Sequence, residues 1–531
     1  MPSMSDRVIS IATQYPHEIA LSINDQHFTY EWFIRAITKA KQKCLGLGLR
    51  SGDRVALVLP NISECVILFY ALNALGITVV MLHPLSSGKT LKERCGFLSC
   101  DAVFILDLLE KRYEKHLDEF KTIVISASDS VKGPLALGLK LKQAFSSSKA
   151  HRWDKVQPDF KLYEPSSQRD AVILFSSGSS GKQKAIRLSD DALNALVDQM
   201  ETVINPERGI DSMFCVLPFF HGFGLGISMH TVLTLGGRCI LVPRLTKDTI
   251  IKTFLREKPT YIAAVPYLLK VFLSDARFTS ADLSYVKQVF VGGESVSLSL
   301  IHEFNKVLEK QGSKAKVQVG YGCTETVTAV TLMPTTDSGQ TGVGIPFKGN
   351  SIKILKEDGT FANENEPGEI LISGPVLMNG YYDNDEENKR VMVQMDGVLA
   401  YRTGDIGHLD QQGILHFHHR LDDLIKVKGF LISPHIITNC LLQVNGIQEA
   451  RVLVDEQDVL TAILTVKENS DLKTIQKETT QVLKELDGWC QPKQFYIIKA
   501  MPINEMRKID MNGLRDGIKN RALQFLLEWS L

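Results

Sequence analysis

Residues 171–189 read AVILFSSGSSGKQKAIRLS, and this segment has the composition of an anion-binding loop. Two apolar runs typical of strands flank a stretch of glycines, hydroxyls and lysines. Its candidate phosphate-binding residues are Ser176, Ser177, Gly178, Ser179, Ser180, Gly181, Lys182 and Lys184. Glycine lets backbone N–H groups approach an anion closely, serine hydroxyls donate further hydrogen bonds, and lysines supply positive charge. The segment therefore predicts a polyphosphate loop, with a flexible Gly/Ser hairpin as the alternative.

Seven further motif-like segments follow one another along most of the chain. They are PFFHGFGLG (218–226), VGGES (291–295), GYGCTET (320–326), GEILISGPVLMNGYY (368–382), YRTGDIGHLD (401–410), HHRLDDLIKVKGF (418–430) and MPINEMRKIDMNGLR (501–515). Their order and spacing resemble the adenylate-forming superfamily of acyl- and aryl-CoA synthetases, beetle luciferases and peptide-synthetase adenylation domains. The resemblance covers nearly the whole chain and is closest to the coumarate-CoA ligase and luciferase branch.

The resemblance implies that one group of residues binds ATP and Mg2+. Tyr321 would offer its ring to adenine, Thr324 a hydroxyl to a phosphate oxygen, and Glu325 a carboxylate to Mg2+, which prefers oxygen ligands. Asp405 would accept hydrogen bonds from the ribose hydroxyls, and Arg420 would donate to the same sugar. The other residues implied at the nucleotide and acyl site are Gly293, Glu294, Ser295 and Gly322.

Lys508 is the residue that the resemblance implies for the first chemical step. Attack of a carboxylate on ATP concentrates negative charge, which a nearby ammonium group stabilises. The family pattern Pro-x-x-x-x-Gly-Lys is kept at Pro502 and Lys508, but Arg507 replaces the glycine. His221 is expected to act at the border of the acyl pocket. Gly222 stands where peptide-synthetase adenylation domains carry an aspartate, which argues against an α-amino acid as substrate.

The second step must present a thiol to the acyl-adenylate, and relatives achieve this by rotating the small C-terminal domain. Asp422 occupies the hinge position of that rotation. Lys426 and the turn Lys428-Gly429-Phe430 would line the path of the thiol, which is expected to belong to coenzyme A or to phosphopantetheine. Relatives usually carry Pro-x-Glu after this turn, whereas this chain has SPHIIT (433–438), so the acceptor stays open.

Short apolar strands alternate with amphipathic helices over most of the chain, which is typical of parallel sheets covered by helices. Closely spaced strands after about residue 340 predict an antiparallel region. With the resemblance, the expected fold is α/β: a large N-terminal domain of two doubly wound α/β subdomains plus a distorted antiparallel β-barrel, and a small mobile α+β C-terminal domain. The expected boundaries are residues 1–420 for the adenylation domain and 421–531 for the domain with the catalytic lysine.

The composition favours a soluble globular protein in a reducing compartment. Lys+Arg and Asp+Glu both number 60, and this zero net charge argues against a nucleic-acid-binding surface. The nine cysteines include no C-x-x-C pair, and no export signal is visible, so a cytoplasmic location is expected. Asn73 and Gly76 interrupt the uncharged stretch 65–82, so we expect a buried helix, turn and strand there and no membrane span.

His416 and His418 are alternate residues of one predicted strand and share a face, and His419 is adjacent to them, so the three could be zinc ligands. Because no acidic or cysteine partner is evident nearby, we expect His416, His418 and His419 to belong to a structural strand that leads to the hinge.

The leading hypothesis is an AMP-forming acid–CoA ligase. Such an enzyme activates a small-molecule carboxylic acid with ATP and Mg2+, releases pyrophosphate and transfers the acyl group to coenzyme A. The alternative is a stand-alone adenylating enzyme that loads an acyl-carrier protein or acylates an amine. A luciferase-like monooxygenase and a nucleotide-binding relative without turnover are further hypotheses. The presence of Lys508, Glu325 and Asp405 counts against the last.

Overall fold

The computed structural model divides into two compact units. Unit 1 comprises Met1–Ile352, Leu371–Arg402 and Gly413–Leu415, and unit 2 comprises Lys353–Ile370, Thr403–Gln412 and His416–Leu531. The residues that the structure describes are 2–126, 151–160, 170–176, 184–204, 206–334, 341–421, 425–427, 430–455, 459–467, 470–486, 490–503 and 509–530. The expected domain boundary after residue 420 stays a prediction.

The first sheet of unit 1 has eight strands in the order β19-β9-β8-β4-β3-β5-β6-β7. Its strands are β3 Arg54–Val58, β4 Thr78–Met81, β5 Ala102–Leu106, β6 Thr122–Ile125, β7 His151–Arg152, β8 Val172–Phe175, β9 Ala185–Leu188 and β19 Gly380–Tyr381. The pairs from β8 through β7 are parallel, and β9 pairs antiparallel with both β8 and β19. The continuous apolar runs of β3, β4 and β5 are buried, as expected of parallel strands covered on both faces.

The second sheet of unit 1 has nine strands in the order β16-β15-β14-β13-β12-β10-β11-β1-β2. Its strands are β1 Ile19–Ile23, β2 Gln26–Thr29, β10 Ser212–Cys215, β11 Arg238–Leu241, β12 Tyr261–Ala264, β13 Gln288–Val291, β14 Val317–Gly322, β15 Ala329–Leu332 and β16 Ile345–Pro346. The strands from β14 through β1 are parallel, and the outer strands add antiparallel edges. The mixed α/β class is therefore confirmed, whereas the hairpin β1–β2 was not predicted.

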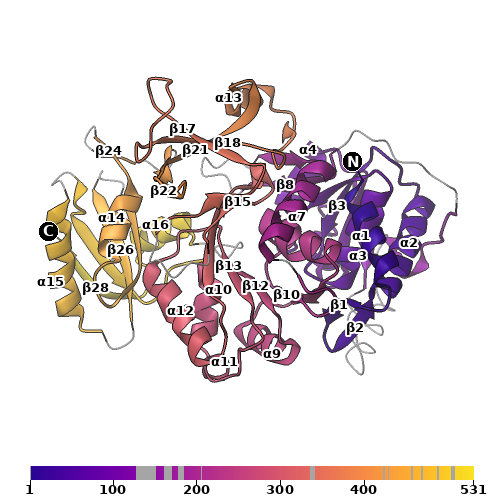
Figure 1. The fold of residues 1–531 in the computed structure, drawn as a ribbon, viewed down its shortest axis with the longest axis horizontal. Helices are drawn as coiled ribbons and strands as arrows, with labels where there is room; N and C mark the ends of the chain where they lie inside the picture. The colour runs from indigo at the N-terminus through magenta and orange to yellow at the C-terminus, as the bar shows by residue number, and fades with distance from the viewer. Residues whose placement is uncertain are drawn as a thin grey trace. The chain divides into compact units, whose positions relative to one another are not determined.

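Helices cover these sheets, and α9, α10 and α12 lie beside the second one (Figure 1). The helices of unit 1 are α1 Met4–Gln14, α2 Tyr30–Gly46, α3 Ser63–Ala74, α4 Gly88–Phe97, α5 Glu110–Tyr113, α7 Asp190–Ile204, the π-helix η4 Phe223–Thr231, α8 Val232–Thr234, α9 Lys247–Glu257, α10 Pro266–Leu273, α11 Ala276–Thr279, α12 Leu298–Lys310 and α13 Asp385–Val391. The uncharged stretch 65–82 forms α3 and β4, as predicted. Across the described ranges, no helix combines the length and apolarity that crossing a membrane requires.

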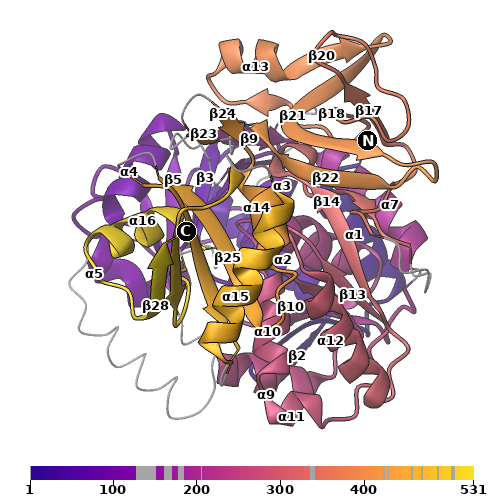
Figure 2. The same cartoon turned by 90° about the vertical axis from the view of Figure 1, so that its left-hand side faces the viewer.

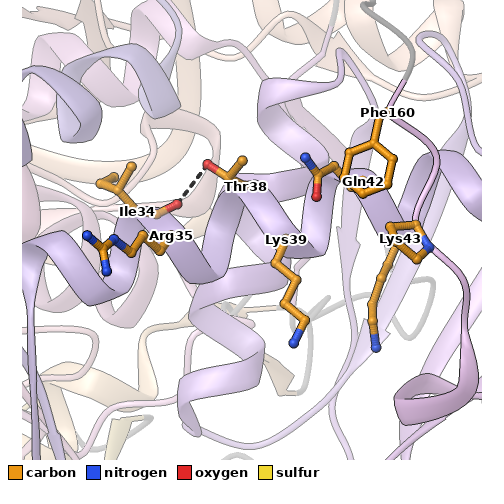
Figure 3. Close-up of a pocket in the computed structure, with 8 residues that line it drawn as sticks. Ile34, Arg35, Thr38, Lys39, Gln42, Lys43 and Phe160 are labelled. Carbon is orange, nitrogen blue, oxygen red and sulfur yellow. Dashed lines mark hydrogen bonds between the residues drawn. The ribbon is translucent and has the colours of Figure 1, made fainter.

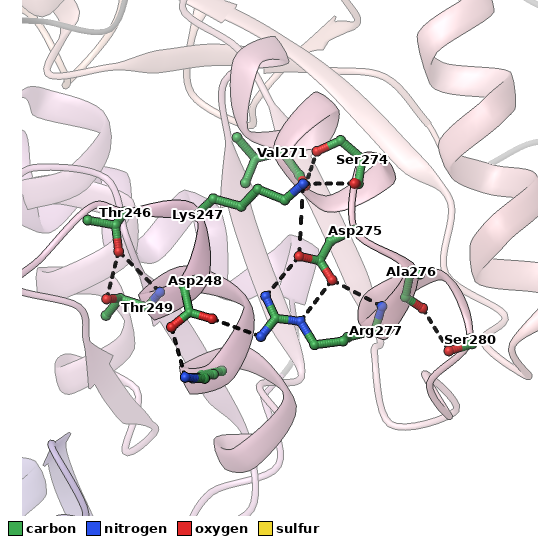
Figure 4. Close-up of polar contacts among 11 residues, drawn as sticks. Thr246, Lys247, Asp248, Thr249, Val271, Ser274, Asp275, Ala276, Arg277 and Ser280 are labelled. Carbon is green, nitrogen blue, oxygen red and sulfur yellow. Dashed lines mark hydrogen bonds and ion pairs between the residues drawn. The ribbon is translucent and has the colours of Figure 1, made fainter.

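An ion-pair network joins the N-terminal ends of α9 and α11 (Figure 4). Asp275 caps α11, and its carboxylate accepts from the Arg277 guanidinium at 2.9 Å. Arg277 also pairs with Asp248 of α9 at 2.8 Å. The Arg277 guanidinium lowers the pKa of Asp275 to about 2. Because Arg277 is largely exposed, we assign this network to fixing two helix ends, where such pairs contribute at most about 1 kcal/mol.

The predicted antiparallel region forms a five-stranded sheet in the order β17-β18-β21-β20, with β22 paired to β21. Its strands are β17 Ser351–Leu355, β18 Gly368–Ser373, β20 Met392–Met395, β21 Val398–Leu409 and β22 Leu415–Arg420. Residues of this sheet belong partly to unit 1 and partly to unit 2.

The rest of unit 2 centres on a four-stranded sheet in the order β25-β26-β27-β28. Its elements are β23 Ile425–Val427, β24 Phe430–Ile432, α14 Pro434–Leu441, β25 Ile447–Val454, β26 Leu460–Val466, α15 Leu472–Val482, β27 Gln494–Ile498, α16 Met511–Lys519 and β28 Phe525–Ser530. Helices α14 and α15 pack on one face of this sheet (Figure 2), and α16 packs on the other. Strand β28 follows α16 and stacks the ring of Trp529 on that of Phe495, with 4.7 Å between the centroids.

A buried histidine ties three helical elements of unit 1 together. His230 of η4 is fully buried and lies between Tyr70 of α3 and Asn194 of α7, each at 3.0 Å from one ring nitrogen. The Asn194 carbonyl oxygen can only accept, so we assign the ring proton to Nε2, and Nδ1 accepts from the Tyr70 hydroxyl. Burial lowers the pKa of His230 to about 3, so the folded protein keeps this ring neutral.

This histidine makes the stability of the protein depend on pH. The folded pKa lies below the unfolded value of 6.5, so below that pH the unfolded chain binds a proton that the folded protein excludes. We expect the free energy of unfolding to fall by up to about 1.4 kcal/mol per pH unit from this group between pH 6.5 and 3. His230→Asn should remove that contribution in denaturant titrations at pH 7.5, 6 and 5. An unchanged pH slope in the variant would contradict the assignment.

Candidate nucleotide site

The anion-loop prediction falls on a strand–loop–strand unit made by β8 and β9. The backbone N–H of Ser176 donates to the carbonyl oxygen of Lys184 at 3.1 Å, and the Lys184 N–H donates to the Ser176 hydroxyl at 3.4 Å. These two bonds hold the ends of the loop together. Ser177, Gly178, Ser179, Ser180, Gly181 and Lys182 lie outside the described residues.

Lys184 lies beside an aromatic ring and a carboxylate that come from later in the chain. Its ammonium is 4.8 Å from the ring centroid of Tyr381 and forms an ion pair with Glu387 of α13. Tyr381 belongs to β19, which pairs with β9, so the sheet itself brings the ring to the end of the loop. Neither Tyr381 nor Glu387 was among the predicted site residues, because only the pairing of β19 with β9 places them here.

Glu325, the predicted magnesium ligand, is buried in a short 3-10 turn and held by a tyrosine. The Tyr381 hydroxyl donates to Glu325 Oε1 at 2.9 Å, and the Tyr401 hydroxyl lies 3.4 Å from that of Tyr381. Burial, together with the charge of Glu325, raises the pKa of both phenols. Since the Tyr381 proton is directed to Glu325, Tyr401 donates to Tyr381. Tyr381 thus connects the loop lysine to the predicted metal carboxylate.

This arrangement fits a magnesium ion. Among the described residues, no three His, Cys, Asp or Glu side chains form a metal-binding group. Mg2+ commonly takes one or two carboxylates and completes its shell with phosphates and water, so one fixed carboxylate beside a phosphate loop suits it. The Tyr381 hydrogen bond fixes one oxygen of Glu325 and leaves the other for a cation.

The turn that carries Thr324 and Glu325 is pressed against glycines. Val327 has φ 63° and ψ −58°, a rare conformation for a β-branched residue, and its side chain is fully buried. A Cβ atom on Gly222 would lie 1.7 Å from the Val327 carbonyl oxygen, and one on Gly322 would lie 1.7 Å from the Thr328 carbonyl oxygen. Backbone therefore packs on backbone here.

These contacts bring several predicted site residues to one edge of the second sheet. Gly222 follows His221 at the start of η4, and Gly322 follows Tyr321 at the end of β14. Gly293, with φ 83°, Glu294 and Ser295 follow the neighbouring strand β13. The carboxyl ends of parallel strands are where open α/β sheets bind ligands. The acyl and adenine pocket, and the role of each residue in it, stay predictions.

The two predicted ribose-binding residues form an ion pair within unit 2. Arg420 Nε on β22 donates to Asp405 Oδ1 on β21 at 2.8 Å. Asp405 is only 2% exposed, whereas the Arg420 side chain is 44% exposed. The Asp405 N–H donates to the Thr403 hydroxyl at 2.9 Å, which fixes the backbone under the carboxylate. The pair presents a fixed acceptor and a more mobile donor side by side.

Lys508, Lys428 and Gly429 lie outside the described residues, as does the side chain of Lys426 in β23. The chain on either side of Lys508 is anchored, because Ile503 and Ile509 form an antiparallel bridge. The predicted hairpin at 428–429 is confirmed by the pairing of β23 with β24.

The expected strand at the three histidines is confirmed as β22, but the premise that no acidic partner lies nearby is wrong. His416 does have an acidic partner, because its Nε2 lies 3.0 Å from the Asp410 carboxylate of the β21–β22 connection. His418 Nε2 is 2.7 Å from Nδ1 of His408 on β21. Antiparallel pairing of strands brings these partners together, and linear spacing along one strand does not reveal it.

A separate surface groove of about 490 Å³ lies along α2 (Figure 3). It is lined by Ile34, Arg35, Thr38, Lys39, Gln42, Lys43, Pro158 and Phe160. None of the predicted site residues lines this groove, so we do not include it in the candidate site.

Comparison with known proteins decides the family. The profile of the AMP-binding enzyme family matches residues 10–382, which is more than half of the chain. The chain belongs to the AMP-binding enzyme family. It is 27% identical over 484 residues to 4-coumarate-CoA ligase 2 of Narcissus pseudonarcissus, covering 88% of this chain and 83% of that protein. It is 26% identical over 535 residues to a long-chain-fatty-acid–CoA ligase of Bacillus subtilis (strain 168), covering 94% and 91%.

Solved structures confirm the fold of this AMP-binding enzyme. The crystal structure of an anthranilate CoA ligase in complex with anthranoyl-AMP superimposes with a TM-score of 0.82 at 20% identity, covering 98% of each chain. The predicted superfamily and α/β fold are thus confirmed. The named acids of these relatives differ in chemistry, so the family alone does not select the substrate.

Removing the charge of Glu325 tests the magnesium assignment. Glu325→Gln should lower adenylation by about 10²-fold, the scale of losing one positioned electrostatic group, and should raise the Mg2+ concentration at half-maximal rate. Pyrophosphate release measured across a magnesium series gives both values. Tyr381→Phe keeps the ring and serves as the control, with a smaller loss. A normal magnesium requirement in Glu325→Gln would rule this residue out as a ligand.

Proposed function

We propose that this protein is an AMP-forming acid–CoA ligase located in the cytoplasm. In the first step a carboxylate oxygen attacks the α-phosphorus of ATP, and pyrophosphate leaves. In the second step the thiol of coenzyme A attacks the acyl carbonyl, and AMP leaves. The proposal is supported by the family match together with two contacts of Tyr381. Its ring contacts the Lys184 ammonium, and its hydroxyl donates to Glu325. All nine cysteines are free thiols, which suits a reducing compartment.

The nucleotide roles follow from the chemistry of each group. Lys184 would bind the β- and γ-phosphates, and Glu325 would hold Mg2+, which neutralises phosphate charge and orients the leaving group. Tyr321 would stack on adenine, and Thr324 would donate to a phosphate oxygen. Asp405 and Arg420 would bind the ribose, with Asp405 accepting from its hydroxyls.

Lys508 should act in the first step alone. Its ammonium would stabilise the charge that builds between the carboxylate and the α-phosphate, so Lys508→Ala should slow acyl-adenylate formation by at least about 10²-fold. Thioester formation from synthetic acyl-adenylate does not build that charge and should change much less. The two half-reactions are measured separately, by pyrophosphate release and by thioester appearance. Equal losses in both would contradict this role.

Coenzyme A is the acceptor that the turn at residues 428–430 supports best. Gly429 permits close backbone approach, and Lys428 can pair with a phosphate of the nucleotide portion. With a matched acid we expect saturable thioester synthesis with free coenzyme A, and Lys428→Glu should raise its KM more than it lowers kcat. If free coenzyme A gives no product and a phosphopantetheinylated carrier protein is acylated, the enzyme loads a carrier. If only an amine is acylated, it forms amides.

The acid is found by screening. Pyrophosphate release should be followed with aromatic, short-chain and long-chain acids at fixed ATP and Mg2+. Release with one class, dependent on that acid, supports the proposal. The absence of acid-dependent release with every class would overturn it.

A further inference from the structure

Lys184 is paired with a carboxylate that the polyphosphate site does not need for binding an anion. The Lys184 ammonium forms an ion pair with Glu387 Oε1, and the two side chains are 28% and 17% exposed. The pair is therefore partly shielded from water, where ion pairs are screened less than at the open surface. Glu387 lies on α13, five residues beyond the motif GEILISGPVLMNGYY (368–382) and outside all of the segments that mark the family in the sequence.

Glu387 bridges two cations. Its Oε2 accepts from Arg390 Nε at 2.7 Å, and its Oε1 accepts from Arg390 Nη2 at 2.7 Å as well as from Lys184. Arg390, followed by Lys184, lowers the pKa of Glu387 to about 2, so the carboxylate is ionised at any working pH. One negative and two positive charges leave this group with a net charge of +1.

A polyphosphate must compete with Glu387 for Lys184. Two anionic groups that approach one ammonium repel each other, and each weakens the binding of the other. Giving up Lys184 does not strand Glu387, because Arg390 continues to bind both of its oxygens. An exchange of partners therefore avoids the penalty of an unpaired, partly buried charge.

Tyr381 holds the Lys184 ammonium at the position where phosphate would replace Glu387. Its hydroxyl is bound to Glu325 and its ring lies against the Lys184 ammonium, so the ring is held at both ends. The ammonium and the predicted metal carboxylate therefore contact the same tyrosine, one at its ring and the other at its hydroxyl, while Glu387 binds the ammonium.

We propose that Glu387 is the resident counter-ion of Lys184, holding its ammonium over Tyr381 in the empty enzyme and yielding it to the phosphates of ATP or pyrophosphate. This proposal rests on the proposed function, since it requires that the loop binds ATP. It follows that Glu387 weakens the binding of both polyphosphates, which favours release of the pyrophosphate product. Glu387 is thus a positioning residue, and a neutral residue in its place should increase affinity.

Equilibrium binding to the full-length protein tests the proposal. Calorimetry with Mg·ATP and with Mg·pyrophosphate should give dissociation constants about threefold to tenfold lower for Glu387→Gln than for the wild type, the scale of one exposed to half-buried ion pair. AMP lacks the β- and γ-phosphates, so its dissociation constant should not change. A selective gain of affinity is a result that damage to the fold does not produce.

Matched variants distinguish loss of the Lys184–Glu387 ion pair from the general effect of removing a negative charge from α13. Glu386→Gln removes the same charge from the exposed neighbouring position of α13 and should leave all three constants unchanged. Adding Glu387→Gln to Lys184→Ala should give no gain, because the competing ammonium is absent. Glu387→Asp, with a carboxylate one methylene shorter, should show a smaller gain and provides a second variant if Glu387→Gln folds poorly.

The outcomes that overturn the proposal are distinct. Weaker ATP binding in Glu387→Gln would make the carboxylate a support for Lys184, and an equal gain in Glu386→Gln would make the effect a general one of charge. An unchanged constant in Glu387→Gln would remove the counter-ion role while leaving the proposed ligase activity intact. If the wild type binds neither Mg·ATP nor Mg·pyrophosphate, both this proposal and the proposed function fall.

Discussion

The turn around Val327 is the constraint on which the candidate site in unit 1 depends. The carbonyl oxygens of Val327 and Thr328 occupy the space where side chains of Gly222 and Gly322 would begin. A β-branched residue with positive φ costs of order 1–3 kcal/mol and persists only where its surroundings fix it. The side chain of Val327 is completely buried, so the packing around it holds the residue in this conformation. The strained turn therefore sets the position of Glu325, two residues earlier, relative to the ends of η4 and β14.

In each unit, the charged residues that are predicted to bind the nucleotide have partners within the protein. Lys184 has Glu387, and Asp405 has Arg420. An unpaired charge in a partly buried position would destabilise the fold by several kcal/mol, so a resident partner is the less costly arrangement. The two pairs differ in how much of each is exposed. Arg420 is exposed and its partner Asp405 is buried, whereas Lys184 and Glu387 are both half-buried. Ligand binding at such a site is an exchange of partners, and its affinity reflects the difference between two pairings.

The local pattern of apolar and polar residues was sufficient to predict most helices and strands, and the ordered motifs were sufficient to predict the family. Buried parallel strands such as β3, β4 and β5 are continuous apolar runs, and α9 has the amphipathic period of a helix, so both could be read directly. Strand β28 was missed because its single buried anchor, Trp529, is recognised only when it stacks on Phe495. The hairpin β1–β2 was missed because its parallel partner β11 lies about two hundred residues later.

Motifs point to candidate site residues but not to the contacts among them. Glu325 and Asp405 were assigned roles from their motifs, and these roles stay predictions. Tyr381, although it lies in the motif 368–382, and Glu387 were assigned none, since their contacts to Glu325 and Lys184 depend on the long-range pairing of β19 with β9. Asp410 was missed as the partner of His416 because the two come together only when β22 pairs with β21. Sequence reveals residue types at a spacing, whereas partners across strands require the register.

The same reasoning explains why the motifs do not reveal the acid. Gly222 and Gly224 of PFFHGFGLG and Gly322 of GYGCTET are required by backbone contacts that would be the same for any acyl group. Selectivity must then come from side chains that are not used for this packing. The ring centroid of Phe220 lies 4.8 Å from that of the adjacent His221 and 4.5 Å from that of His83, which comes from a distant part of the chain. A change in these rings would leave the backbone contacts of the strained turn in place, so the acid can vary while the turn is kept. The two relatives named above are ligases of acids that differ in chemistry.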